Sequence, residues 1–205
     1  MRARDIMTSP VIAVVPETRI KKAAALLAEY GFSGLPVVDS DEHLVGMVTE
    51  ADLVRDRVPS DPRAHISVHP PSADGPVSTT VGEVMSSPAV AVEPGTDVAD
   101  LAATLLETHQ RTTPVVDGSR LVGIVTRRDI VRTIAREDDT IATDVRRRLE
   151  VYGGTGRWQV EVHDGVVTIS DTFDDDTDRH VAKVLAEAVP GVVRADTVAS
   201  NGERR

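Results

Sequence analysis

Two short polar motifs hold the residues best suited to bind a ligand. Both follow the pattern G-x-V-T-x-x-D, the first from Gly46 to Asp52 and the second from Gly123 to Asp129. Each stands where a predicted strand gives way to a predicted helix. Such a junction presents backbone N–H groups to a phosphate, a threonine hydroxyl can bond the phosphate, and a carboxylate one turn on can accept two ribose hydroxyls. The motifs therefore fit a nucleotide site.

The same spacing has a purely structural interpretation. A threonine followed three residues later by an acidic residue is a variant of the capping box, which closes the N-terminus of a helix without any ligand. Thr49 with Asp52 and Thr126 with Asp129 both fit it. Aspartate is short for reaching back to the cap N–H, so we expect these carboxylates to favour an outward role. Spacing alone leaves both interpretations open.

The motifs belong to a longer internal repeat. The sequence TSPVIAVVPET at Thr8–Thr18 returns as SSPAVAVEPGT at Ser86–Thr96, and LPVVD at Leu35 returns as TPVVD at Thr113. The sequence distance between equivalent residues of the two copies falls by one residue before the motifs, because one turn of the second copy is one residue shorter. An indel confined to a turn is typical of duplicated folded units. We expect the two copies to fold alike.

Each copy has the pattern β-α-β-β-α. In the first copy the apolar run Val11–Val15 precedes a helix for which Thr18 is the expected cap and Gly31 the stop. Thr96 is the expected cap in the second copy. Two strands, at Leu35–Val38 and Leu44–Val48 in the first copy, and a second helix complete the unit. A unit of this size buries little apolar surface alone, so we expect the copies to share a core in an α+β fold.

A proline-rich linker is expected between the copies, at residues 58–79. It contains His65 and His69, whose spacing suits a metal ion on a helix. Pro62 and Pro70 bracket them, however, and no third ligand stands nearby, so a solvated linker is the preferred interpretation.

Composition excludes several classes of protein. The chain has 205 residues, a net charge of −10 and no cysteine. The acidic balance argues against nucleic-acid binding, and the absence of cysteine excludes thiol chemistry. The sequence has no export signal or membrane-spanning run, which predicts a cytoplasmic protein. It also lacks a glycine-rich phosphate loop and a nucleophile–base set at suitable spacing, so we expect no enzyme.

These features together resemble a tandem pair of CBS domains, the Bateman module. The resemblance rests on the Ser9-Pro10 and Ser87-Pro88 openings, the P-V-V-D strands and the two T-x-x-D junctions. It covers a first domain at residues 1–57 and a second at residues 80–137. It implies two repeats packed as a pseudo-twofold pair, an adenosine-containing ligand in the clefts between them, and a homodimer.

The resemblance also implies which residues hold the ligand. Asp52 and Asp129 would bind ribose hydroxyls, and Thr49 and Thr126 would contact phosphate or ribose. The base would be enclosed by the segments after the two S-P prolines and before the two P-V-V strands, that is, by Pro10, Val11, Gly34, Leu35, Pro36, Pro88, Ala89, Thr112, Thr113 and Pro114.

The two expected sites differ in charge. Arg127 and Arg128 follow the second threonine, whereas Glu50 and Ala51 follow the first. We therefore hypothesise that the second site prefers a phosphorylated ligand; the alternative is that the two arginines form a solvated helix face. AMP, ADP and ATP are the expected ligands, with S-adenosylmethionine and NAD as competitors. Some related proteins carry an arginine where this chain has Gly34 and Thr112, with Arg111 one position earlier, which leaves triphosphate selectivity open.

The C-terminal region, residues 140–200, has a third pattern. Ile141, Val145 and Leu149 mark a helix, and Asp164-Gly165 is a hairpin signal between two alternating strands. A second helix, with the apolar residues Val181, Val184, Leu185 and Ala188, follows, and then a last strand. This α-β-β-α-β order, with DGVVTIS and AVPGV, resembles a BON domain. Asp171 stands where that family usually has glycine.

BON domains are associated with phospholipid or envelope binding, which implies a membrane or protein contact for this region. Arg146, Arg147 and Arg148 could face anionic headgroups, but the acidic segment at Asp171–Asp178 supplies the opposite charge. A face balanced within the domain is therefore the preferred interpretation.

Two functions from different classes follow. The first is a non-catalytic regulator that senses an adenine nucleotide through its CBS pair and relays the signal through the dimer or the BON domain. The second is a structural or stress-associated adaptor, in which the T-x-x-D junctions are only caps and the BON domain docks independently of nucleotide.

Overall fold

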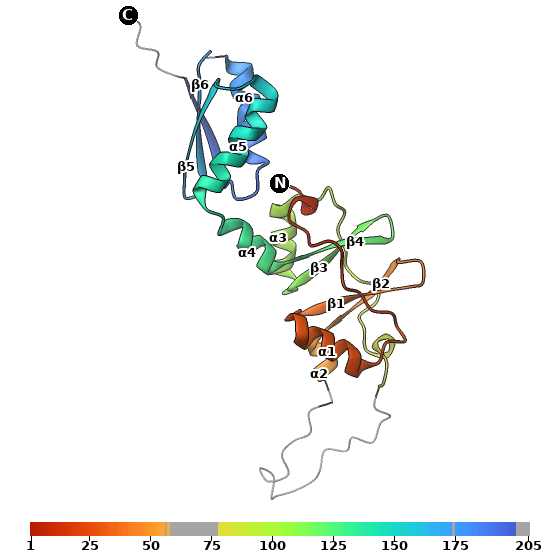
Figure 1. The fold of residues 1–205 in the computed structure, drawn as a ribbon. Coiled ribbons are helices and arrows are strands. Elements are labelled where there is room, and N and C mark those ends of the chain that lie inside the picture. Colours follow the sequence, from red (N-terminus) through yellow and green to blue (C-terminus); the bar gives the residue numbers. More distant parts are fainter. Residues whose placement is uncertain (56, 58–77, 174, 200–205) are drawn as a thin grey trace, which may run out of the picture. The chain divides into compact units, whose positions relative to one another are not determined.

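A computed structural model describes residues 1–55, 57, 78–173 and 175–199 (Figure 1). The chain divides into two compact units. One comprises Thr8–Pro94 and Thr108–Ile124; the other comprises Met1–Met7, Gly95–Glu107 and the chain from Val125 onward. His65 and His69 of the expected linker lie outside the described residues.

The first repeat forms the predicted mixed α+β unit. Its elements are α1 (Ile20–Tyr30), β1 (Gly34–Val38), β2 (Leu44–Thr49) and α2 (Glu50–Val54). Strands β1 and β2 are antiparallel, with Leu35 opposite Val48. Both side chains are buried, because they lie on the face of the ribbon that packs on the helices. The core of this part consists of Val14, Ile20, Ala23, Leu27, Leu35, Val37, Val48, Leu53 and Val81.

The expected first strand is reduced to one bridge. Val14 lies parallel to Val37: its N–H donates to the carbonyl of Pro36 at 3.0 Å, and its carbonyl accepts from Val38 at 2.9 Å. Pro16 has no N–H to donate at the next ladder position, so the pairing stops there. The second repeat has the equivalent bridge, between Val92 and Val115.

The second repeat contains α3 (Val98–Glu107), β3 (Thr112–Asp117), β4 (Arg120–Thr126) and α4 (Arg127–Ile134). Strands β3 and β4 form a two-stranded sheet, as β1 and β2 do. The same order of elements in both repeats confirms that the duplicated sequence folds as mixed α+β units.

The predicted helix caps are wrong by one residue. Helix α1 begins after Arg19, while the Thr18 hydroxyl accepts from the N–H of Val15 at 3.1 Å. Ahead of α3, the Asp97 carboxylate accepts from the N–H of Ala99 at 2.9 Å, so Asp97 and not Thr96 has the cap position. A side-chain acceptor is free to close a turn instead of a helix, and propensity does not decide between them. The stop at Gly31 is confirmed, with φ of 65°.

The first segment of each repeat packs on the other repeat. The short 3-10 turn η3 (Val81–Glu83), which opens the second repeat, packs on the first, where the N–H of Val81 donates to Thr18 at 2.9 Å. The equivalent turn η1 (Ala3–Asp5) packs on the second repeat, where the N–H of Ala3 donates to Thr96 at 2.8 Å. Ala3 and Val81 are both fully buried. We call this arrangement the reciprocal exchange.

The C-terminal region has the predicted order of elements: α5 (Asp138–Gly153), β5 (Trp158–His163), β6 (Val166–Asp171), α6 (Asp176–Glu187) and β7 (Arg194–Ala199). The hairpin between β5 and β6 turns at Asp164-Gly165, where both φ angles are positive, as predicted. Strand β7 pairs in parallel with β6. Helix α5 packs on β5 and α6 on β7, and the helices contact each other (Figure 1).

The predicted apolar face of α5 is confirmed, and α6 packs on the sheet mainly through alanines. Ile141, Val145 and Leu149 of α5 are buried in the core. On α6 the buried residues are Ala182 and Ala186, while Val184 is 52% exposed. The alanines let α6 approach the sheet closely, so Val184 is left exposed while Leu185 packs only partly against the core.

The described part of the chain contains no helix with the length and hydropathy needed to cross a membrane.

Candidate ligand-binding site

Both T-x-x-D junctions are closed capping boxes. At the start of α2, the N–H and hydroxyl of Thr49 donate to Oδ2 of Asp52 at 2.9 and 2.7 Å. At the start of α4, Thr126 donates to Oδ2 of Asp129 at 2.8 and 2.7 Å. The expectation that aspartate reaches poorly back to the cap is therefore wrong, because the threonine hydroxyl and N–H converge on one carboxylate oxygen.

The second oxygen of each carboxylate is left for other donors. Oδ1 of Asp52 accepts none of the hydrogen bonds made among the described residues, and Asp52 is half-buried. Oδ1 of Asp129 lies 3.5 Å from the Arg132 guanidinium, and Asp129 is 9% exposed. A capping role and one further hydrogen bond are thus compatible.

The glycine of the first motif has a packing reason. Met47 forms an antiparallel bridge with Ser86, with N–H···O distances of 3.0 and 2.9 Å. A Cβ on Gly46 would come within 2.9 Å of the Ser86 carbonyl and within 2.8 Å of the Met85 sulfur. Only glycine admits this approach, which brings the start of the second repeat against the first junction.

A cavity of about 600 Å³ lies beside that junction. Four of the sequence-predicted residues line it together: Thr49 from the first repeat, and Pro88, Ala89 and Thr112 from the second. The remaining lining residues are Ser33, Met47, Glu50, Ala51, Ser86, Val90, His109, Gln110 and Arg111. The repeats thus jointly form a cavity large enough for a small ligand.

Polar contacts cross the cavity between the repeats. The Ser33 and Thr112 hydroxyls are 2.8 Å apart, and Arg111 lies 3.5 Å from the Glu50 carboxylate. Glu50 and Arg111 are both more than half exposed, so their ion pair contributes little to stability. A ligand can separate these two charges at small cost.

Other predicted residues do not line the cavity. Asp52 turns toward Thr49, Pro10 is exposed and Val11 is half-buried. The strand residues are buried: Gly34, Leu35, Pro36, Thr113 and Pro114. Thr126, Arg127, Arg128 and Asp129 belong to the other unit.

Arg127 has a structural partner. Its guanidinium donates to the carbonyl of Leu105 at 2.6 Å, in the last turn of α3. Arginine at this position satisfies a carbonyl that the helix end leaves unpaired. Arg128 is exposed. The pair of arginines thus splits into one helix-end contact and one solvated side chain.

Sequence reasoning missed several lining residues. Ser33 and Arg111 directly precede the predicted site residues Gly34 and Thr112, Gln110 precedes Arg111, and Ser86 precedes the second S-P opening. The available signal was that these residues stand next to predicted site residues in the sequence. That signal could not show that Glu50, which follows the cap Thr49, would contact Arg111, because the two residues are far apart in the sequence.

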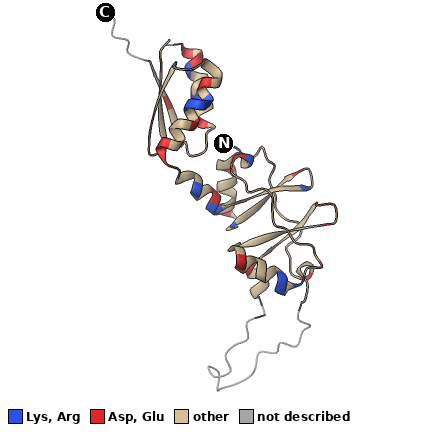
Figure 2. Cartoon of the chain, in the orientation of Figure 1, with Lys and Arg blue, Asp and Glu red and all other residues tan. Residues whose placement is uncertain are grey.

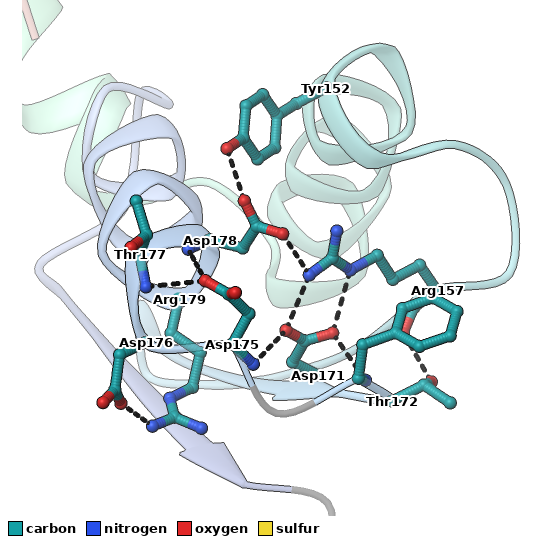
Figure 3. Close-up of polar contacts among 10 residues, drawn as sticks. Tyr152, Arg157, Asp171, Thr172, Asp175, Asp176, Thr177, Asp178 and Arg179 are labelled. Carbon is teal, nitrogen blue, oxygen red and sulfur yellow. Dashed lines mark hydrogen bonds and ion pairs between the residues drawn. The ribbon is translucent and has the colours of Figure 1, made fainter.

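A second polar cluster, which we call the Arg157 cluster, stabilises the C-terminal region (Figure 3). Asp171, fully buried at the end of β6, accepts from Nε and NH2 of Arg157 at 2.9 and 2.8 Å. Arg157 also contacts Asp178 of α6 at 2.6 Å, and the Tyr152 hydroxyl of α5 donates to Asp178 at 2.7 Å. One guanidinium therefore links a strand and both helices.

Charge pairing sets the pKa values in the Arg157 cluster. Hydrogen bonds from Arg157 lower the pKa of Asp171 to about 2, against the opposite effect of burial. Hydrogen bonds from Tyr152 and Arg157 lower the pKa of Asp178, and that from Tyr152 raises the tyrosine pKa in turn. Both carboxylates are ionised at neutral pH.

Comparison with known proteins gives the family of the repeats. The CBS domain model matches the chain twice, at residues 3–58 and 81–136, which together exceed half of its length. The chain belongs to the CBS domain family.

Relatives share the CBS pair. CBSX1, a chloroplastic CBS domain-containing protein of Arabidopsis thaliana, is 37% identical over 135 residues, covering 58% of this chain and 57% of CBSX1. The chain thus matches little more than half the length of that relative.

Two solved structures are similar in fold. CBSX2 of Arabidopsis thaliana in complex with AMP is 34% identical with a TM-score of 0.53, covering 64% of this chain and 93% of that one. The CBS pair of protein MJ0100 in complex with 5-methylthioadenosine and S-adenosyl-L-methionine is 27% identical with a TM-score of 0.52, covering 64% and 94%.

Proposed function

We propose that this protein is a non-catalytic regulator that binds an adenosine-containing ligand in the cavity beside the first T-x-x-D junction. The observation that carries the proposal is the cavity itself, in which Thr49 of the first repeat lies with Pro88, Ala89 and Thr112 of the second. Residues that the CBS resemblance assigns to ligand binding therefore come together from distant parts of the sequence.

The ligands of relatives support the adenosine class. CBSX2 was solved with AMP, and MJ0100 with 5-methylthioadenosine and S-adenosyl-L-methionine. These ligands share adenosine and differ at its 5′ group. Asp52 does not line the cavity itself, but its Oδ2 binds the lining residue Thr49 and its Oδ1 is left for another donor. In our proposal the ribose hydroxyls reach this Oδ1 past Thr49, or Oδ1 of Asp129 at a second site, and AMP, ADP, ATP, S-adenosylmethionine and NAD are the candidates.

The signal would pass by a population shift. A ligand that contacts both repeats favours one arrangement of the pair by no more than its differential affinity for the two arrangements. We propose a homodimer through the CBS pair, domains at residues 1–57 and 80–137, and relay through the dimer or the C-terminal region.

We further propose that residues 140–200 form a BON domain. The α5-β5-β6-α6-β7 order and the Asp164-Gly165 hairpin support this assignment. Asp171, which departs from that family's usual glycine, has a structural role here as the buried partner of Arg157.

A thermal-shift screen tests the sensor. The purified chain is melted with AMP, ADP, ATP, NAD and S-adenosylmethionine, alongside Asp52→Ala and Asp129→Ala. A ligand at a hundredfold excess over its dissociation constant adds about 2.7 kcal/mol to the free energy of unfolding. The variants lose a cap, so the quantity to compare is the ligand-dependent difference in Tm. A gain that vanishes in one variant supports the sensor and locates its site.

The second candidate is an adaptor whose C-terminal region docks regardless of nucleotide. The specific observation in its favour is that Asp52 and Asp129 each close a capping box with their own threonine, a structural role that is sufficient to explain both motifs. If no nucleotide raises the Tm, while both variants lower it equally, the junctions are only caps and the sensor is wrong.

A further inference from the structure

A groove runs between α5 and α6 on the C-terminal region. Its volume is about 690 Å³, and it is lined by Asp144, Arg147, Arg148, Val151, Tyr152, Val181, Leu185, Val189 and Pro190. Nothing in the proposed nucleotide chemistry uses it. All of its residues belong to one unit, so its shape is fixed by the packing of α5 on α6.

The floor of the groove is apolar for a definite reason. Helix α6 packs on the sheet through Ala182 and Ala186, and its half-buried Val181 and Leu185 line the groove, with Leu185 also packed against the core. On α5, Val151 is 87% exposed. Exposed Val151 of α5 and half-buried Val181 and Leu185 of α6 thus leave apolar surface available for a partner.

Tyr152 adds a rigid aromatic wall. Its hydroxyl donates to Asp178, which is itself paired with Arg157, so these contacts restrain the orientation of the tyrosine ring. Interfaces concentrate their binding energy on such immobilised aromatic side chains, because little conformational entropy is lost on binding.

The rim of the groove is cationic. Its one lining carboxylate, Asp144, pairs with Arg136 at 2.5 Å, and Arg136 also donates to the carbonyl of Pro190 at 2.5 Å. Arg147 and Arg148 make no hydrogen bond or ion pair with the described residues, and both are exposed. Figure 2 shows the basic residues on α5. The rim therefore offers two uncompensated positive charges beside an apolar floor.

We propose that this groove docks an acidic amphipathic helix of a partner protein. Leucine-type side chains would fill the floor beside Val151 and Leu185, and carboxylates would pair with Arg147 and Arg148. The lining of α5, from Asp144 to Tyr152, extends over about 12 Å, enough for about two turns of helix. A second copy of this chain is disfavoured, since a twofold contact would bring each arginine pair against its equal.

The test uses the full chain and a fluorescein-labelled peptide. The peptide is designed as an amphipathic helix with leucines at i, i+4 and i+7 and glutamates on the flanks. Two matched peptides have lysine for glutamate, or the same composition in scrambled order. Fluorescence anisotropy is measured with the parent chain and with Arg148→Glu, Val151→Glu and a control reversal, Arg194→Glu, on β7.

We expect saturable binding of the acidic peptide only. Arg148→Glu and Val151→Glu should each weaken it about tenfold or more, whereas Arg194→Glu should leave it nearly unchanged. Both test positions are exposed, so circular dichroism should show unchanged folding. Absence of binding, equal binding of the lysine or scrambled peptide, or an equal loss with Arg194→Glu would overturn the proposal.

A membrane is the other anionic, apolar partner to exclude. Co-sedimentation with phosphatidylcholine–phosphatidylglycerol vesicles is measured in parallel. Vesicle binding that Arg148→Glu and Val151→Glu abolish, with no peptide binding, would assign the groove to lipid and overturn the peptide proposal. Neither result depends on nucleotide, so failure here is distinguishable from failure of the proposed sensor.

Discussion

At the scale of single residues, Glu50 and Arg111 decide the charge of the candidate cavity. Arg111 is the lining residue best suited to a phosphate, but the Glu50 carboxylate lies 3.5 Å from it. A phosphorylated ligand must compete with that carboxylate, whereas an uncharged 5′ group need not. Under the proposed function, this ion pair would favour less charged adenosine ligands without any steric selection.

Replacing Glu50 by glutamine should increase affinity for phosphorylated ligands. The change removes one negative charge at nearly constant size and frees Arg111 to bind phosphate, so we expect AMP to bind about threefold to tenfold more tightly. Isothermal titration calorimetry measures this. Glu42→Gln is the matched control, because Glu42 forms a similar surface ion pair with Arg120 outside the cavity lining. An equal gain in both variants would mean a general charge effect.

The sequence predicted the junctions and part of the cavity, but not its charges. Thr49 could be named from its T-x-x-D junction, and Pro88, Ala89 and Thr112 from the resemblance to CBS domains. The Glu50–Arg111 contact joins non-equivalent positions of the two repeats, so the repeat gives no signal for it. The spacing of the motif likewise could not predict that two donors of Thr49 bind the same oxygen of Asp52.

At the scale of elements, the Arg157 cluster holds the C-terminal region together. Asp171 and Arg157 are 0% and 13% exposed, so their contact is screened little by solvent. Arg157 also stacks on Trp158, with its guanidinium carbon 4.4 Å from the ring centroid. The single tryptophan of the chain therefore reports on this cluster directly.

Acid should destabilise this region in a defined window. Because the folded-state pKa of Asp171 is lowered from 3.8 to about 2, its stabilisation is complete above about pH 4 and is lost as pH falls toward 2. The loss amounts to about 2 kcal/mol. This loss is measured by urea unfolding followed by Trp158 fluorescence, with one unfolding curve recorded at about every half pH unit between pH 6 and pH 2.5.

Removing the carboxylate should remove the pH dependence too. Asp171→Ala leaves a nearly buried guanidinium with one partner fewer, so we expect a loss of about 3 kcal/mol at neutral pH. Asp196→Ala, at an exposed pair with Arg194, is the control and should cost less than about 1 kcal/mol. Equal effects of the two substitutions would contradict the role assigned to Asp171.

Elements were predicted more reliably than their faces or ends. The order of helices and strands followed from apolar periodicity and turn residues, as at Gly31 and Asp164-Gly165. The face of α6 did not, because the choice between Ala186 and Val184 depends on how closely a helix can approach the sheet. The cap at Thr18 failed since its hydroxyl closes the preceding turn, and the cap at Thr96 failed since the neighbouring Asp97 takes the cap position.

At the scale of the whole molecule, the reciprocal exchange ties the repeats together. Val81 is buried in the core of the first repeat, and Ala3 is buried beside α3 of the second. Neither repeat is therefore complete within the continuous stretch of sequence that defines it. The repeat pattern could not predict this, because an exchanged segment and a retained one have the same sequence.

Opening the chain between Arg57 and Ser78 should leave an associated pair of pieces. If residues 1–57 and 78–205 are co-expressed with a tag on one piece, we expect them to copurify in equal amounts. Val81→Asp should abolish copurification, because it buries a charge in the other piece's core. Val131→Asp, at a position 60% exposed on α4, is the control. Copurification unaffected by Val81→Asp would contradict the exchange.

The exchange also bears on how such a chain can arise by duplication. A protein with a single repeat would contain one N-terminal segment and one surface on which such a segment packs. In the geometry of this chain, however, the segment packs on the neighbouring repeat and not on its own. Two separate copies would have to exchange these segments between molecules, and their folding would depend on protein concentration. Joining the copies in one chain makes the exchange intramolecular and gives it a fixed effective concentration. Gene fusion would thus convert an obligate dimer into a protein that folds alone.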